Sequence, residues 1–177
     1  MNIILIGYRG TGKTAVGKAL SERLARPFYD ADVFLEEKLS RTISNIVAKD
    51  GWPYFRAREK EIIRELSALN GCVIATGGGA VMDHDNVDCL SDNGIFILLK
   101  ADTPTMIKRI QGDETSRQQR PALLAGNIHE ETEALIEKRM PTYERVADMV
   151  VDTTHLGIDD VVEQIINNVM KDLALES

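Results

Sequence analysis

Short runs of aliphatic and β-branched residues alternate along the chain with longer segments in which apolar residues recur every three or four positions. Continuously apolar runs are typical of strands buried on both faces of a parallel sheet, and the longer spacing is typical of helices with one apolar face. The pattern predicts five strands, at Ile3–Ile6, Pro27–Asp30, Val73–Ala75, Ile95–Leu99 and Met149–Val151.

Helical segments are predicted in the gaps between these strands, at Lys13–Leu24, Val33–Leu39, Tyr54–Leu69, Thr103–Ile110, Glu130–Tyr143 and Ile158–Leu173. This alternation predicts an α/β fold of three layers, with a five-stranded parallel sheet flanked by helices. No repeat or proline-rich linker divides the sequence, so we expect residues 1–177 to form a single domain.

The periodic pattern breaks between residues 111 and 128, where polar residues, glycine and arginine replace the regularly spaced apolar ones. Long loops without secondary structure are uncommon in compact domains and usually have a functional reason to exist. We therefore predict a mobile lid over about residues 111–126.

Composition narrows the classes of partner. The chain is 44% hydrophobic with no apolar run near the roughly 20 residues that cross a bilayer, so no membrane span is expected. Its net charge of −7 argues against a broad nucleic-acid surface, which needs excess Lys and Arg. The first strand follows Met1 almost directly, which leaves no room for a signal peptide and predicts a cytoplasmic protein.

Gly7–Thr14, with the sequence GYRGTGKT, matches the GxxxxGK[ST] pattern and lies between a predicted strand and a predicted helix. The glycines allow backbone N–H groups to face phosphate oxygens, the helix N-terminus adds a partial positive charge, and Lys13 adds a full one. Thr14 can ligate Mg²⁺. A glycine-rich turn without a ligand is the alternative, but the context favours a nucleotide phosphate site.

Asp30 and Asp32 lie at the end of the second predicted strand, and ligands of open α/β sheets bind at the carboxyl ends of strands. If the segment is extended, both carboxylates share one face. One can then hold Mg²⁺ through water while the other accepts a proton from an acceptor hydroxyl. The alternative is that Asp32 merely caps the helix that follows.

Two arginines and a glycine run are candidates for an acceptor site. Arg56 and Arg139 could grip a carboxylate with forked hydrogen bonds if they converge, although a surface ion pair of Arg56 with Glu59 is the ordinary alternative. Gly77–Gly79 follow a strand and allow a ligand to touch the backbone, unless they serve only a flexible turn.

The predicted lid contributes Arg117 and Arg120, and Arg109 ends the helix before it. Arginines there can close over a nucleotide as charge redistributes on its γ-phosphate. Solvated loop charge is the alternative, and proline at position 121 makes Arg120 the better candidate.

Six motifs, in this order and along nearly the whole chain, resemble those of the shikimate kinase family: GYRGTGKT, FYDAD, FRARE, TGGGA, the Arg-Pro pair of the lid and EKRMPTYERVAD. The resemblance implies a P-loop kinase fold similar to that of nucleoside monophosphate kinases. It also implies MgATP-dependent phosphorylation of the shikimate 3-hydroxyl, a step of chorismate and aromatic amino acid biosynthesis. We expect a monomer with ATP and shikimate as its small-molecule partners.

On the donor side, the resemblance implies that Thr14 ligates Mg²⁺ and that Asp30 supports the ion through water. Lys13 and Arg120 would be catalytic. The implied ATP contacts are Gly10, Thr11, Gly12, Lys13, Thr14, Ala15, Arg109 near the adenine, and Arg120.

On the acceptor side, the resemblance implies that Asp32 meets the acceptor hydroxyl as a catalytic residue. Arg56 and Arg139 would grip the shikimate carboxylate and Gly78 would contact the acceptor through its backbone, with the acceptor segment at about residues 32–60.

One departure concerns the lid: the family often has Arg-Pro-Leu-Leu, whereas Ala122 intervenes here, so Arg109 and Arg117 could exchange roles. A kinase for another hydroxy acid, such as gluconate, and a nucleotide-binding regulator without catalysis remain the alternative functions.

Overall fold

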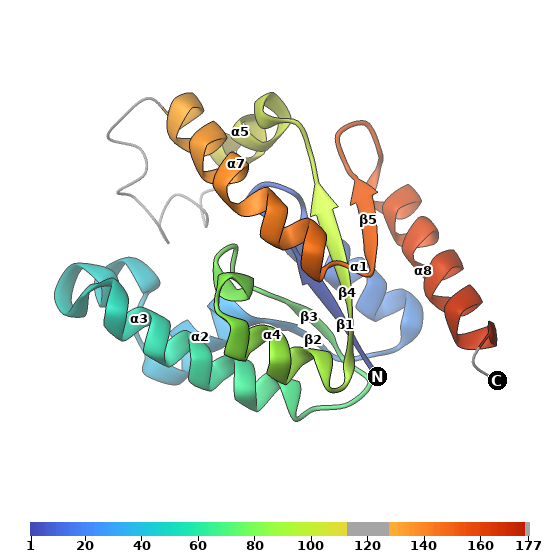
Figure 1. Cartoon of the computed structure of the whole chain (residues 1–177), viewed down its shortest axis with the longest axis horizontal. Helices are drawn as coiled ribbons and strands as arrows, with labels where there is room; N and C mark the ends of the chain where they lie inside the picture. The colour runs from blue at the N-terminus through green and yellow to red at the C-terminus, as the bar shows by residue number, and fades with distance from the viewer. Residues whose placement is uncertain (113–127, 176–177) are drawn as a thin grey trace.

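The computed structural model describes residues 1–112 and 128–175, which contain one sheet of five parallel strands with helices on both faces (Figure 1). The strand order is β2-β3-β1-β4-β5. The strands are β1 (Asn2–Ile6), β2 (Phe28–Asp30), β3 (Val73–Ala75), β4 (Gly94–Lys100) and β5 (Met149–Asp152). The predicted fold class and all five strands are confirmed, with small shifts at their ends.

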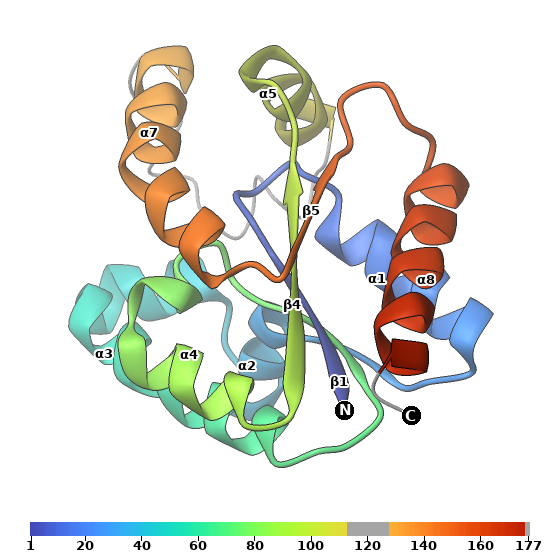
Figure 2. The ribbon, with the colours of Figure 1, turned by 45° about the vertical axis from the view of Figure 1, so that its right-hand side comes forward.

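Seven helices and one 3₁₀ turn are described. The helices are α1 (Lys13–Leu24), α2 (Ala31–Leu39), α3 (Ile43–Ser67), α4 (His84–Ser91), α5 (Thr103–Gly112), α7 (Ile128–Val146) and α8 (Ile158–Leu175), and the turn η1 spans Ala80–Met82. The view in Figure 2 separates the layers, with α1 and α8 on one side of the sheet and α2, α3 and α4 on the other.

The central strand β1 explains why its sequence is apolar without alternation. Ile3 and Leu5 belong to the core on the α1 and α8 side, whereas Ile4 and Ile6 belong to the core on the α2 and α3 side. All four side chains are at most 1% exposed. Successive side chains of a strand point to opposite faces, so a strand covered on both faces must be apolar at every position.

Helix α3 is longer than predicted, because it begins at Ile43 rather than at Tyr54. Gly51 interrupts it with non-helical backbone at φ 82°, and Pro53 follows in the first turn of the second segment, where its missing N–H costs nothing. Glycine and proline together hid the first segment from the periodic pattern. Helix α4 was not predicted: it is short, and the side chain of Asp83 caps it.

The start of α2 corrects the prediction made for Asp32. The helix begins at Ala31, and the side chain of Asp30, not of Asp32, accepts hydrogen bonds from the backbone N–H groups of Asp32 and Val33. Asp32 therefore lies in the first helical turn, and the two aspartates do not alternate along an extended segment.

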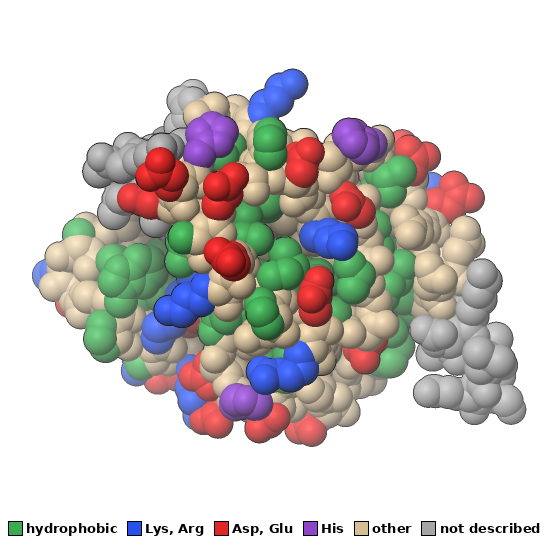
Figure 3. All heavy atoms as spheres, turned by 45° about the horizontal axis from the view of Figure 1, so that its top comes forward, with side chains coloured by type: hydrophobic (Ala, Val, Ile, Leu, Met, Phe, Trp, Pro, Cys, Tyr) green, Lys and Arg blue, Asp and Glu red, His purple; other side chains and the backbone are tan. Residues whose placement is uncertain are grey.

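Of the predicted lid, Gln111 and Gly112 are the last residues of α5, and residues 113–126 lie outside the described part of the chain. Among the described helices, none combines the length and apolar character that crossing a membrane requires. The face in Figure 3 intersperses acidic and basic side chains, with no continuous basic field.

Candidate active site

The phosphate loop connects the carboxyl end of β1 to α1, as its sequence predicts. Gly12 is the N-cap of α1 and Gly10 precedes it, with φ values of 96° and 78° that favour glycine. A Cβ atom on Gly10 would lie 2.7 Å from the backbone oxygen of Met106 in α5. The loop is thus wrapped so tightly that α5 packs against its backbone.

The ammonium group of Lys13 lies over its own loop. Its Nζ donates to the backbone oxygens of Gly7 at 2.8 Å and of Tyr8 at 2.9 Å. These carbonyl oxygens hold the cation at the loop that would receive phosphate, so a positive charge stands there although the chain as a whole is acidic.

Thr14 and Asp30 form the second feature of the phosphate site. The Thr14 hydroxyl donates to Oδ2 of Asp30 at 2.7 Å, which joins the start of α1 to the end of β2. A hydroxyl and a carboxylate are oxygen ligands of the kind that Mg²⁺ prefers, and phosphate sites complete the coordination with phosphate oxygens and water. No larger cluster of potential metal ligands occurs in the described ranges.

The three glycines after β3 bring the predicted acceptor residues together. A Cβ atom on Gly77 would lie 2.7 Å from Oδ1 of Asp32, and one on Gly79 would lie 2.5 Å from Nη2 of Arg56. Between them, the backbone oxygen of Gly78 accepts a hydrogen bond from Nη1 of Arg139 at 3.1 Å. Each glycine therefore adjoins a different predicted acceptor residue. The sequence left open whether Asp32, Arg56 and Arg139 lie close together, and in the structure all three adjoin the glycine loop.

Glu59 is a site residue whose importance the sequence did not reveal. Its carboxylate is ion-paired with Arg56, as the spacing of three predicted, but the Glu59 side chain is only 4% exposed, so this is no surface pair. Its Oε1 is buried without a hydrogen-bond partner and lies 2.9 Å from where a Cβ of Gly77 would be. Burial of position 59 follows from the heptad-like face of α3 that also carries Phe55 and Ile62.

Aromatic rings support both arginines. The guanidinium carbon of Arg56 lies 5.8 Å from the ring centre of Trp52 and 5.1 Å from that of Phe55. The same carbon of Arg139 lies 5.8 Å from the ring centre of Tyr8 in the phosphate loop. These distances suit cation–π attraction, which orients the arginines next to the glycine loop.

Arg109 is held against the phosphate loop. It donates to the backbone oxygen of Gly10 at 3.3 Å and, at 3.0 and 2.8 Å, to the hydroxyl and backbone oxygens of Thr153 after β5. It thereby fastens the loop to the fifth strand, while its role near adenine stays a prediction. Arg117 and Arg120 lie outside the described residues.

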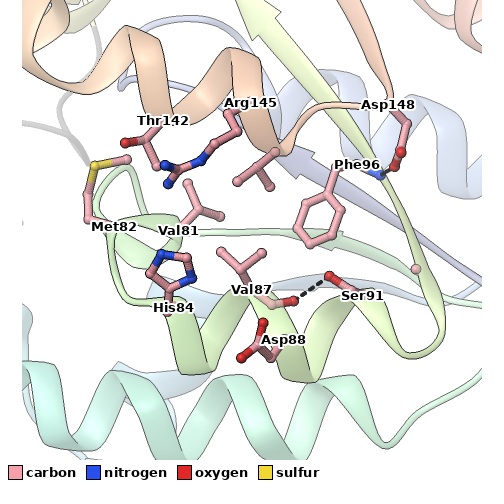
Figure 4. A pocket seen from close by; sticks show the side chains of 12 residues that line it. Val81, Met82, His84, Val87, Asp88, Ser91, Phe96, Thr142, Arg145 and Asp148 are labelled. Carbon is pink, nitrogen blue, oxygen red and sulfur yellow. Dashed lines mark hydrogen bonds between the residues drawn. The ribbon is translucent and has the colours of Figure 1, made fainter.

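A pocket of about 400 Å³ lies elsewhere, between α4 and the last turns of α7 (Figure 4). Its lining includes Gly94 at the amino end of β4 and Asp148 just before β5. In parallel sheets ligands bind at the carboxyl ends of strands, so this pocket is not part of the candidate site. The candidate site instead lies at the carboxyl ends of β1, β2 and β3.

The parallel sheet and the wrapped loop with Lys13 and Thr14 define a P-loop nucleotide-binding protein. The polar cluster beside that loop, with two arginines and a carboxylate facing three glycines, adds the second site that a small-molecule kinase requires. Residues 9–170 match the protein-family model described as shikimate kinase. The chain belongs to the shikimate kinase family.

Relatives and solved structures agree with this assignment. The shikimate kinase of Syntrophus aciditrophicus is 43% identical over 173 residues, which cover 93% of this chain and 89% of that relative. The shikimate kinase of Pelotomaculum thermopropionicum is 40% identical over 166 residues, covering 94% of each chain. A shikimate kinase from Acinetobacter baumannii, solved in complex with shikimate, is similar with a TM-score of 0.90 at 33% identity, covering 97% of this chain and 93% of that chain.

Proposed function

We propose that this chain transfers the γ-phosphate of ATP to the 3-hydroxyl of shikimate. The observation that carries the proposal is the convergence of Asp32, Arg56 and Arg139 on Gly77–Gly79, directly beside the phosphate loop. A cyclic hydroxy acid has the two functions that this cluster is built to meet, a carboxylate for the arginines and a hydroxyl for the carboxylate.

On the donor side, the backbone N–H groups from Gly10 to Ala15 hold the phosphates at the start of α1. Lys13 exchanges its loop carbonyl partners for phosphate oxygens, which are stronger acceptors for an ammonium group because they are charged. Its charge then stabilises the γ-phosphate as negative charge spreads over the transferred group. Arg120 would add a second cation from the lid.

On the acceptor side, Arg56 and Arg139 bind the carboxylate and thereby fix the ring so that one hydroxyl faces Asp32. Asp32 orients that hydroxyl in line with the phosphate and accepts its proton. Asp32 lies in the first turn of α2, and this position suits a carboxylate because the N-terminus of a helix favours negative charge.

The oxygen atoms of Thr14 and Asp30 fit Mg²⁺, with Thr14 as a direct ligand and Asp30 acting through water. The ion, when bound, would neutralise negative charge on the phosphates of ATP. We further propose that the protein works as a cytoplasmic monomer with no nucleic-acid or membrane partner.

A coupled ADP-release assay with MgATP tests the proposal against its alternatives. Shikimate, quinate, gluconate and nucleoside monophosphates are offered one at a time at the same concentration. We expect ADP release that depends on shikimate. Release with gluconate instead would make the chain a kinase of another hydroxy acid, and ATP binding without acceptor-dependent release would make it a regulator.

A further inference from the structure

The backbone oxygen of Gly78 receives two hydrogen bonds from one face of α7. Nη1 of Arg139 donates to it at 3.1 Å, and the hydroxyl group of Tyr143 donates to it as well. Residues four positions apart lie on the same side of a helix, and a carbonyl oxygen has two lone pairs, so both donors can be satisfied together. Helix α7 is thus fastened to the glycine loop at one atom.

The two donors differ in their freedom to move. Tyr143 is 1% exposed and its ring belongs to the core that also holds Tyr8 and Phe55, so its hydroxyl is fixed from the inside. Arg139 is only half-buried and its guanidinium lies over the ring of Tyr8. The hydrogen bond from Tyr143 to Gly78 therefore comes from a buried side chain, while the bond from Arg139 comes from a side chain with more freedom to change its rotamer.

We propose that Tyr143 is a positioning residue for the acceptor carboxylate, an inference that rests on the proposed function. When a carboxylate arrives, Arg139 exchanges the neutral oxygen of Gly78 for a charged one, which is the stronger acceptor. Tyr143 keeps the Gly78 oxygen hydrogen-bonded throughout. The glycine loop and α7 therefore stay joined, and Arg139 presents its fork from an unchanged position.

Removing the Tyr143 hydroxyl changes this exchange. The Gly78 oxygen then has only Arg139 as a donor from α7, so Arg139 must abandon it to reach the carboxylate. Leaving a polar group of this kind without a partner is costly, and the cost falls on acceptor binding. The chemical step and the nucleotide contacts do not involve this bond.

The test uses four full-length proteins: the parent, Tyr143→Phe, Arg139→Ala and the double variant. Shikimate binding is followed by the fluorescence of Trp52, the single tryptophan of the chain, which lies against Arg56. Tyr143→Phe is expected to raise the shikimate Kd and KM about tenfold, with kcat and the ATP KM within about twofold of the parent. Phenylalanine fills the same space, so the variant is expected to fold.

The Arg139→Ala background separates positioning from a general effect on the fold. Because Tyr143 acts through Arg139, adding Tyr143→Phe to Arg139→Ala is expected to change the shikimate Kd by less than about twofold, a clear departure from additivity. Tyr29→Phe is the matched control: Tyr29 packs edge-on against Phe34 in the same core, and the change is expected to leave shikimate binding unaltered.

Two results would overturn the proposal: a shikimate Kd of Tyr143→Phe equal to that of the parent, or the same loss in both backgrounds. A parent that neither binds nor phosphorylates shikimate would refute the proposed function itself, which is a different outcome.

Discussion

The carboxylate of Asp30 serves two neighbours with its two oxygen atoms. Oδ2 accepts the hydroxyl of Thr14 at 2.7 Å, and Oδ1 accepts the backbone N–H of Asp32 at 3.1 Å. One side chain therefore joins the phosphate loop to the helix that carries the proposed proton acceptor. Placement of the metal ligand and placement of the acceptor carboxylate depend on the same residue.

These two tasks of Asp30 can be separated by substitution. Asp30→Asn keeps an oxygen that caps α2, so the free energy of unfolding should change little, whereas Asp30→Ala should lower it by about 1 kcal/mol. Both variants lose the carboxylate, so both should need several times more Mg²⁺ for half-maximal velocity. Thermal unfolding and a Mg²⁺ titration of turnover measure the two effects.

Asp83→Ala is the matched control for the Asp30 variants, because Asp83 caps α4 away from the phosphate loop. It should lower stability as Asp30→Ala does while leaving the Mg²⁺ requirement unchanged. An unchanged Mg²⁺ requirement in Asp30→Asn would remove Asp30 from the metal site.

The glycine loop gives a second prediction. A Cβ on Gly79 would lie 2.5 Å from Nη2 of Arg56, so Gly79→Ala must push the guanidinium aside. A displacement of this size should raise the acceptor KM by about tenfold or more and leave the ATP KM nearly unchanged. Gly112→Ala, at the end of α5, is the control, since no atom of another described segment lies within 4 Å of its Cβ position. Equal acceptor KM values for the two variants would contradict the predicted clamp.

Local features of the sequence were enough to predict the phosphate loop and the strands. The motif from Gly7 to Thr14 fixes its own geometry, and β1 is apolar at each position because both faces are covered. Local sequence did not decide which of two nearby residues caps α2. Asp30 and Asp32 are both residue types that suit the cap position, and Asp30 takes that position because it ends the strand before the helix.

Contacts between distant segments were the other part that sequence did not supply. Tyr143 and Gly78 are 65 positions apart, and nothing near either residue indicates that they meet. The burial of Glu59 likewise depends on the loop from Gly77, which folds over α3. In retrospect, the spacing of four between Arg139 and Tyr143 was a usable signal, because it places both side chains on one face of α7.

Because Arg56 is ion-paired with the buried Glu59, we expect a substitution of Glu59 to restore part of the stability that is lost when Arg56 is removed. Arg56→Ala leaves a carboxylate that is only 4% exposed without its cation, which should cost about 2 kcal/mol, less than for a fully buried pair because Arg56 is 36% exposed. Adding Glu59→Gln removes the buried charge and should restore about half of that loss. Chemical denaturation of the single and double variants measures it.

The exposed pair of Lys38 and Glu65 provides the comparison, with side chains 50% and 46% exposed. Lys38→Ala should change the free energy of unfolding by less than about 1 kcal/mol, and Glu65→Gln should rescue nothing measurable. If Arg56→Ala behaved like Lys38→Ala, Glu59 would not be a desolvated charge.

Acid should weaken the fold through aspartates that are hydrogen-bonded rather than ion-paired. The side chain and backbone N–H of Thr105 lower the pKa of Asp102 below its ordinary value of 3.8. A carboxylate whose pKa is lower in the folded state than in the unfolded state stabilises the folded state fully above about pH 4. This stabilisation is lost as the pH falls through the pKa of the folded state. The stability advantage of the parent over Asp102→Asn should therefore shrink in melts taken from pH 6 to pH 2.

Salt distinguishes Asp102 from Asp85, whose pKa is lowered chiefly by the side chain of Lys60. High salt screens an exposed ion pair, and in 0.5 M salt the screening length is only about 4 Å. The acid-dependent contribution of Asp85 to the free energy of unfolding should therefore fall in 0.5 M salt. The contribution of Asp102 should persist. An equal response of Asp85→Asn and Asp102→Asn to salt would contradict this assignment of causes.

The sharpest prediction concerns Asp32 and the chemical step. Asn has the same shape and fits beside Gly77, where Oδ1 of Asp32 now lies, so Asp32→Asn should fold and still bind the acceptor hydroxyl. It cannot accept the proton, and kcat should fall by about 10²-fold to 10⁴-fold with a small change in acceptor KM. Asp30→Asn provides the contrast, because added Mg²⁺ should restore its turnover but not that of Asp32→Asn. Near-normal kcat in a well-folded Asp32→Asn protein would show that the hydroxyl gives up its proton to some other group.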